Sequence, residues 1–118
     1  KIPAIEKIFY PGFKDFKGYN IHKKQAKGAG GMISFTLKKD YSVNEFFKNL
    51  KIIILAESLG GAESLICHPA SMTHASVPEK MRKEIGIADN LIRFSVGIED
   101  KKDLAEDLEQ AFKKSKKS

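Results

Sequence analysis

Apolar and polar residues alternate along parts of this chain with the period of β-strands. Along residues 32–37, Ile33, Phe35 and Leu37 fall on one side of the chain, and the intervening residues fall on the other. A period of two residues is typical of a strand with one buried face. Further strands are predicted at 52–56, 63–67 and 91–96, with a short extended segment at 6–10.

Capping residues and helical spacing predict helices between these strands. Ser42 and Glu45 form a capping box, in which each side chain accepts a hydrogen bond from the other residue's backbone N–H. Apolar residues then recur at helical spacing over 43–50. A short basic helical turn is predicted at 21–27. Asp100 opens a last helix, whose inward positions are Leu104, Leu108, Ala111 and Phe112.

A second capping box predicts a helix before the last strand. Ser76 and Glu79 have the required spacing, and Pro78 occupies the first helical position, where its missing N–H carries no penalty. Met81 and Ile85 lie at helical spacing in this segment. We therefore expect both side chains to face the core.

The predicted order of elements indicates an α+β fold. From residue 32 onward it runs strand, helix, strand, strand, helix, strand, helix, which is the split βαβ order. This order predicts a mostly antiparallel sheet with helices packed on one face. At 118 residues the chain has the length of one domain, 1–118. The lysine-rich end, 113–118, is predicted to fray.

Composition narrows the class of protein. The formal net charge of +6 comes from 21 basic and 15 acidic residues, and the basic excess is concentrated at the C-terminal end. The single cysteine, Cys67, cannot form an internal disulfide, which favours a reducing compartment. The longest apolar run, 52–56, is too short to span a bilayer. We expect a cytoplasmic chain that does not associate with membranes. Its opening residues carry no helix cap or targeting signal, as expected of a chain cut from a longer one.

Several familiar site patterns are incomplete in this sequence. The glycines at 28–31 lack the spacing of a dinucleotide-binding loop, and they precede a strand. Cys67, His68 and His74 match no usual zinc spacing, so no metal site is predicted. The strand at 32–37 lacks the base-stacking aromatic residues of an RNA-recognition fold. Nucleic acid is therefore not an expected partner, although the basic end and the split βαβ order leave an RNA-binding module as a remote alternative.

Two features are suited to binding the carboxylate of an amino acid. Ser58 lies at a strand-to-glycine turn within 56–61, where backbone N–H groups can act as donors. Arg93 lies on the polar side of the strand at 91–96, and a guanidinium binds a carboxylate through two parallel hydrogen bonds. Taken alone, each is also compatible with an ordinary turn or a solvated side chain.

Segments in order along nearly the whole chain carry a resemblance to a known family. The most specific are AESLGG at 56–61, HPASMTHAS at 68–76 and LIRFSVG at 91–97, and they are joined by matches at 10–12, 24–25, 30–35, 63–66 and 99–100. Together they resemble the carboxy-terminal domain of the pyridoxal-phosphate-dependent Cys/Met-metabolism enzymes. The resemblance implies the small domain that closes over the substrate in fold-type I enzymes of this kind.

The resemblance implies half of an active site. Arg93 stands where the family's arginine forms a salt bridge with the substrate α-carboxylate, and Ser58 stands where a serine backbone contributes to the same site. Glu57 matches an acidic position near the distal end of the substrate, which is common in cystathionine γ-synthases and γ-lyases. A loop beside the cofactor is implied for Met72, Thr73 and His74.

The resemblance also implies what this chain lacks. In the family, an amino-terminal large domain binds pyridoxal 5′-phosphate through a Schiff-base lysine in a Ser-x-Thr-Lys context, and that context is absent here. The 118 residues alone are therefore predicted to contain no catalytic residue and to be inactive.

The implied parent is a homotetrameric carbon–sulfur lyase or transferase of trans-sulfuration. A cystathionine γ-synthase or γ-lyase type is favoured, with cystathionine or an O-acylhomoserine as substrate. Cystathionine β-lyase, methionine γ-lyase and O-acetylhomoserine sulfhydrylase are the alternatives within the family.

Overall fold

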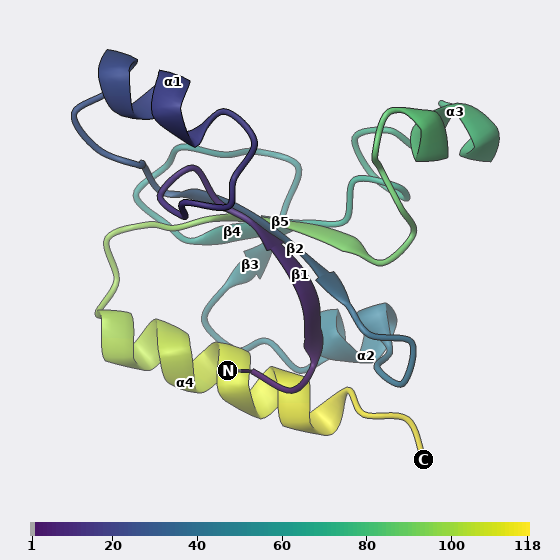
Figure 1. Ribbon diagram of the computed structural model, residues 1–118. Helices are drawn as coiled ribbons and strands as arrows, with labels where there is room; N and C mark the ends of the chain where they lie inside the picture. The colour runs from purple at the N-terminus through teal and green to yellow at the C-terminus, as the bar shows by residue number, and fades with distance from the viewer. Residues whose placement is uncertain (1) are drawn as a thin grey trace.

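The helices and strands of the protein follow one another around a central sheet (Figure 1), in a computed structural model that describes residues 2–118. The strands are β1 (Ile5–Phe9), β2 (Met32–Leu37), β3 (Ile54–Leu55), β4 (Leu65–Cys67) and β5 (Leu91–Ser95). The helices are α1 (Tyr19–Gln25), α2 (Val43–Lys48), α3 (Glu79–Glu84) and α4 (Lys101–Lys114). No helix in the described part of the chain combines the length and the apolar character that a membrane crossing requires.

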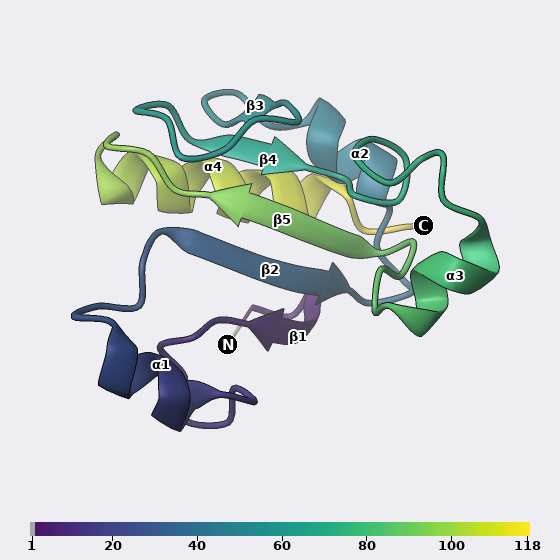
Figure 2. The ribbon, with the colours of Figure 1, turned by 90° about the horizontal axis from the view of Figure 1, so that it is seen from above.

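The sheet has the strand order β1-β2-β5-β4-β3. β3 and β4 are parallel, and the other neighbouring pairs are antiparallel. β2 and β4 therefore run in the same direction with β5 between them, as Figure 2 shows. This is the split arrangement, and the predicted α+β class with a mostly antiparallel sheet is confirmed.

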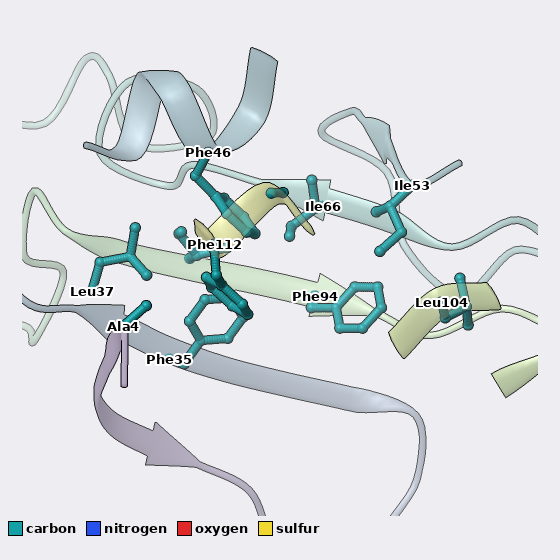
Figure 3. Close-up of a cluster of buried hydrophobic side chains, with 11 residues drawn as sticks. Ala4, Phe35, Leu37, Phe46, Ile53, Ile66, Phe94, Leu104 and Phe112 are labelled. Atoms are coloured by element: carbon teal, nitrogen blue, oxygen red, sulfur yellow. The ribbon is translucent and has the colours of Figure 1, made fainter. Parts of the chain in front are cut away.

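The core lies between the sheet and the pair of helices α2 and α4 (Figure 1). Phe46 of α2 stacks on Phe112 of α4 with ring centroids 4.7 Å apart, and Phe35 of β2 meets both rings edge-on. Figure 3 shows these rings at the centre of the buried cluster. Ile92 and Phe94 of β5 face the same cluster. Because side chains alternate along a strand, Arg93 and Ser95 point to the opposite face of the sheet.

Two of the predicted helices begin with the expected caps. The Ser42 hydroxyl accepts a hydrogen bond from the backbone N–H of Glu45 at the start of α2. The Asp100 carboxylate accepts hydrogen bonds from Lys102 N–H and Asp103 N–H at the start of α4. Each cap satisfies donors that a helix N-terminus leaves free.

The prediction of a second capping box, at Ser76 and Glu79, is wrong. α3 begins without a side-chain cap, and its N-cap position is occupied by Pro78. Met81 and Ile85, which were expected to face the core, are 55% and 63% exposed. α3 is a short helix that buries none of its residues, and it lies apart from α2 and α4. Met81 and Ile85 therefore share one face of α3, as predicted, but no other element of the described chain covers that face.

The apolar run at 52–56 is also only partly a strand. β3 comprises Ile54–Leu55 alone, is an edge strand paired only with β4, and leaves both side chains exposed. Ile53, directly before β3, supplies the buried side chain instead. Pairing with β4 begins only at Ile54, because the backbone N–H groups of residues 51–53 donate to a side chain outside the sheet.

Those N–H groups donate to Asp107 of α4. Asp107 Oδ1 accepts from Lys51 N at 2.8 Å, and Oδ2 accepts from Ile52 N and Ile53 N at 2.9 and 3.0 Å. Gln110 Nε2 also donates to Oδ1. Burial raises the pKa of the Asp107 carboxyl, but these hydrogen bonds outweigh it and hold the pKa below its ordinary value. An ionised carboxylate thus ties the start of β3 to α4.

The lysine-rich end differs from the frayed tail predicted over 113–118. Lys113 and Lys114 complete α4, and Ser115 is buried at its C-cap. Lys116 pairs with Tyr41, and Lys117 N–H donates to the Asp40 carbonyl at 2.9 Å. The segment is therefore hydrogen-bonded to the turn that precedes α2.

Candidate functional site

The loop between β3 and β4, residues 56–64, lies against one side of β5. Arg93 Nη2 donates to the main-chain carbonyl of Glu57 at 2.7 Å. Two residues further along, Ser95 Oγ accepts from the backbone N–H of Gly60 at 2.9 Å. The structure therefore brings Arg93 to the turn that contains Glu57 and Ser58.

The second half of the loop is held by the residues that follow β5. Ser64 N–H and Ser64 Oγ donate to the two oxygens of Glu99 at 2.6 and 2.7 Å, and Ser64 Oγ accepts from Gly97 N–H at 2.8 Å. The hydrogen bonds from Ser64 hold the pKa of the Glu99 carboxyl below its ordinary value. Ile98 N–H donates to the Ala62 carbonyl at 2.9 Å.

Every second residue from 93 to 99 contacts the loop, and the loop residues that they contact follow one another in the same order. We call this series the 93–99 row: Arg93 contacts residue 57, Ser95 contacts residue 60, and Gly97 and Glu99 contact residue 64. Gly97 must lack a side chain, because a Cβ there would lie 2.2 Å from the carbonyl oxygen of Ala62 and 2.6 Å from the carbonyl carbon of Glu63. The row fixes the backbone of the loop relative to the sheet.

Within residues 2–118, no carboxylate neutralises the charge of the Arg93 guanidinium. No ion pair joins it to an acidic side chain within residues 2–118, and the carbonyl of Glu57 is its hydrogen-bond acceptor there. Its side chain is half-buried. A charged fork with donors to spare is suited to binding an anion in two-point fashion.

The turn beside Arg93 offers a further donor. The backbone N–H of Ser58 donates to no acceptor within residues 2–118, and Ser58 is exposed. Glu57 is exposed as well, and its carboxylate forms no hydrogen bond or ion pair in the described chain. Arg93, Ser58 and Glu57 thus belong to one open surface that the 93–99 row organises.

The segment predicted to lie beside a cofactor begins at the other end of β4. The loop 56–64 precedes β4, whereas residues 72–74 follow it. Thr73 Oγ1 and His74 Nδ1 lie 2.8 Å apart, and Met72 Sδ accepts from His68 N–H. No hydrogen bond joins residues 72–74 to the 93–99 row in the part of the chain that the structure describes. Arg93 is paired with Cys67, the last residue of β4, so residues 72–74 follow the end of β4 beside Arg93 but form no hydrogen bond with it in the described chain.

The candidate site is an open surface. Hollows of about 530, 570 and 430 Å³ occur in the described protein, and none is lined by Arg93, Ser58 or Glu57. The first is an apolar hollow between residues 2–4 and α4, on the helix side of the sheet. Any molecule held by Arg93 would need a second surface to enclose it.

No lysine among residues 2–118 is in an environment suited to a Schiff base with pyridoxal phosphate. A lysine that reacts with a carbonyl needs its amine neutral near pH 7, which burial commonly achieves, but every lysine among residues 2–118 is exposed. The same range contains no group of three or more His, Cys, Asp or Glu residues placed to hold a metal ion. The cofactor chemistry implied by the resemblance is not provided by these residues.

Ser95, Gly97, Glu99 and Ser64 are site-forming residues that the sequence analysis missed. Their contacts join positions 33–35 apart in the chain, and no local pattern specifies such partners. The available signal is the spacing of two that continues from Arg93, which places Ser95 on the same side of the strand.

Comparison with protein-family models matches residues 1–113 to a family described as "Cys/Met metabolism PLP-dependent enzyme". Among curated proteins, a cystathionine β-lyase of Lactococcus lactis subsp. cremoris is 53% identical over 111 residues, which is 94% of this chain. A cystathionine γ-lyase of Bacillus subtilis (strain 168) is 52% identical over 110 residues, or 93% of this chain. The chain spans about 29% of the length of these relatives.

Solved structures share the fold over almost the whole chain. The cystathionine γ-lyase from Lactobacillus plantarum complexed with L-serine is similar with a TM-score of 0.94 and 47% identity, over 98% of this chain and 30% of that one. The cystathionine γ-synthase from Xanthomonas oryzae pv. oryzae in complex with cystathionine has a TM-score of 0.90 and 41% identity, over 96% of this chain and 30% of that one.

Proposed function

Because the chain belongs to the Cys/Met-metabolism PLP-dependent enzymes, we propose that it forms the substrate-carboxylate site of a larger carbon–sulfur lyase or transferase. The observation that carries the proposal is the Arg93 guanidinium, which lies beside the Glu57–Ser58 turn without an acidic partner in the described chain. A substrate that satisfies this arrangement has a free carboxylate.

The proposed mechanism of binding uses Arg93 and the Ser58 backbone together. The guanidinium donates paired N–H···O bonds to the α-carboxylate, and the N–H of Ser58, which has no acceptor within residues 2–118, is a further donor to the same anion. Since Arg93 projects from β5, a strand with neighbours on both sides, the carboxylate is held against a rigid support. Such fixation orients the bonds at Cα for reaction.

The cofactor belongs to the part of the protein outside this chain. Pyridoxal phosphate stabilises negative charge at carbon next to the amino group of an amino acid, and the chain's exposed lysines are not suited to hold it. We propose that these 118 residues bind the substrate's acid group and that the remaining polypeptide binds the cofactor. The chain alone is then inactive.

The favoured substrates are cystathionine or an O-acylhomoserine. The Lactobacillus and Xanthomonas proteins are complexed with L-serine and with cystathionine, which share the α-amino-acid group that Arg93 would bind. Glu57 is proposed to face the distal end of the substrate, since its carboxylate is exposed beside Arg93. Synthase and γ-lyase reactions are favoured, and β-lyase activity is a second candidate because a β-lyase is among the relatives. We also propose that the whole protein is a cytoplasmic homotetramer.

The experiment is an Arg93→Ala substitution in the full-length protein, with kinetics on an amino-acid substrate. We expect KM to rise and kcat/KM to fall at least a hundredfold, about 3 kcal/mol of lost transition-state stabilisation. Arg82→Ala is the matched control, because Arg82 is bound to the Val77 carbonyl and to Asp89, outside the loop. Equal kcat/KM values for Arg93→Ala and Arg82→Ala would contradict the proposal.

A further inference from the structure

We propose that Ser95 is a positioning residue that sets the 57–60 turn at the distance from Arg93 at which both can bind one carboxylate. This inference rests on the proposed function. Ser95 is 3% exposed and has no access to a ligand, so it acts only through its contact with the loop.

Ser95 is well placed to fix the turn. It ends β5 and is paired with Met32 of β2 on one side and Leu65 of β4 on the other. Its Oγ accepts the N–H of Gly60, the residue that turns the chain with φ +74°. A hydroxyl anchored on a doubly paired strand gives the turn a fixed reference point.

The turn has few other supports. On its N-terminal side, Ala56 N–H donates to the Ile66 carbonyl at 2.9 Å, and on its C-terminal side the Ala62 carbonyl accepts from Ile98 N–H. Between these bonds, the hydrogen bonds that hold residues 57–60 in the described chain come from Arg93 and Ser95. β3, which leads into the loop, is only two residues long.

Arg93 and Ser95 differ in what happens when a carboxylate arrives. An arriving anion binds the guanidinium N–H groups and competes with the Glu57 carbonyl, which occupies one of these donors. The bond between Ser95 and Gly60 involves no ligand atom and stays in place. Ser95 therefore preserves the position of the Ser58 N–H during binding, which reduces the ordering that binding would otherwise require.

The experiment compares Ser95→Ala with Ser115→Ala in the full-length protein. Ser115 is also buried, at 1% exposure, and its hydroxyl makes one hydrogen bond, to the Phe112 carbonyl, at the end of α4. Each variant is assayed with the free amino acid and with its α-carboxamide. We expect Ser95→Ala to raise KM for the free acid about tenfold, with kcat changed less than twofold and the preference for acid over amide reduced about tenfold. Ser115→Ala should leave the preference unchanged.

Amide hydrogen exchange gives a second readout that needs no variant. In the unaltered protein, the Gly60 amide should exchange at least tenfold more slowly than the Ser58 amide, because only the former has an acceptor within residues 2–118. Ser95→Ala should remove that protection, whereas Ser115→Ala should not.

The outcomes separate this inference from the proposed function. If Arg93→Ala leaves the acid-over-amide preference unchanged, the carboxylate site itself is refuted. If Arg93→Ala abolishes the preference while Ser95→Ala changes neither the preference nor the exchange of Gly60, the positioning role is refuted and the carboxylate site stands. An unprotected Gly60 amide in the unaltered protein also overturns the role of Ser95.

Discussion

Removing the Asp107 carboxylate should unfold the chain far more readily than removing any exposed acid of α4. Asp107 is 4% exposed and accepts the N–H groups of Lys51, Ile52 and Ile53. In Asp107→Ala these donors lose their acceptor. The bond to Ile53 is fully buried, and those to Lys51 and Ile52 are partly buried. Leaving the Ile53 donor unpaired should cost about 2 kcal/mol of unfolding free energy and each of the other two about 1 kcal/mol, or about 4 kcal/mol together. This is a large part of the 5–15 kcal/mol typical of a domain.

Urea denaturation followed by circular dichroism tests this estimate. Asp107→Ala should lower the midpoint by about 2 M for a domain of this size. Asp107→Asn should lose about half as much, because its one oxygen still accepts from Ile52 and Ile53. Glu106→Ala removes an exposed carboxylate on the same helix and should shift the free energy of unfolding by less than about 0.5 kcal/mol. Midpoints that coincide for Asp107→Ala and Glu106→Ala would refute the reasoning.

The pH dependence of stability follows from the same contacts. The pKa of the Asp107 carboxyl is held below its ordinary value of 3.8, so the folded state binds fewer protons than the unfolded state in that range. The stabilisation is therefore complete above the ordinary value and is lost as the pH falls through the lower, folded-state pKa. Asp107→Asn should show a shallower loss of stability below about pH 4.

Two other substitutions test the 93–99 row and the substrate surface. Gly97→Ala should destabilise the chain by about 3 kcal/mol in urea denaturation, because its Cβ would overlap the Ala62 carbonyl. Gly28→Ala is the control and should be nearly neutral, because a Cβ at Gly28 meets open space. Equal losses of stability in the two variants would argue against the close packing at Gly97. In the full-length protein, Glu57→Val should change the ratio of kcat/KM values for cystathionine and a methionine-like substrate, whereas Glu63→Val, a substitution of an exposed acid in the same loop, should not. An unaltered ratio in Glu57→Val would count against a distal-end role.

The parts of the fold that were predictable are those specified by neighbours in the sequence. Ser42 and Asp100 cap helices through residues two or three positions away, and the alternation around Phe35 depends only on the strand period. Met81 and Ile85 show where such patterns fail. Helical spacing describes which side chains share a face, but burial also requires another element against that face.

The site divides in the same way. Arg93 was predictable as a residue on the polar side of its strand, and the resemblance suggested its role. Ser95 and Glu99 could not be predicted, because their partners Gly60 and Ser64 are 35 residues away and are reached only when the loop folds back on β5. Pairing across that separation depends on the strand order, which local patterns do not specify.

Arg93 contacts Glu57 through the main-chain carbonyl, an atom that every amino acid possesses. The identity of side chain 57 is therefore uncoupled from the support of the loop. Saturation mutagenesis at this one codon should yield folded proteins for most residue types, with proline and glycine as the expected exceptions because they alter backbone freedom. Such a library would vary the chemistry presented to a bound molecule while the scaffold beneath it stays constant.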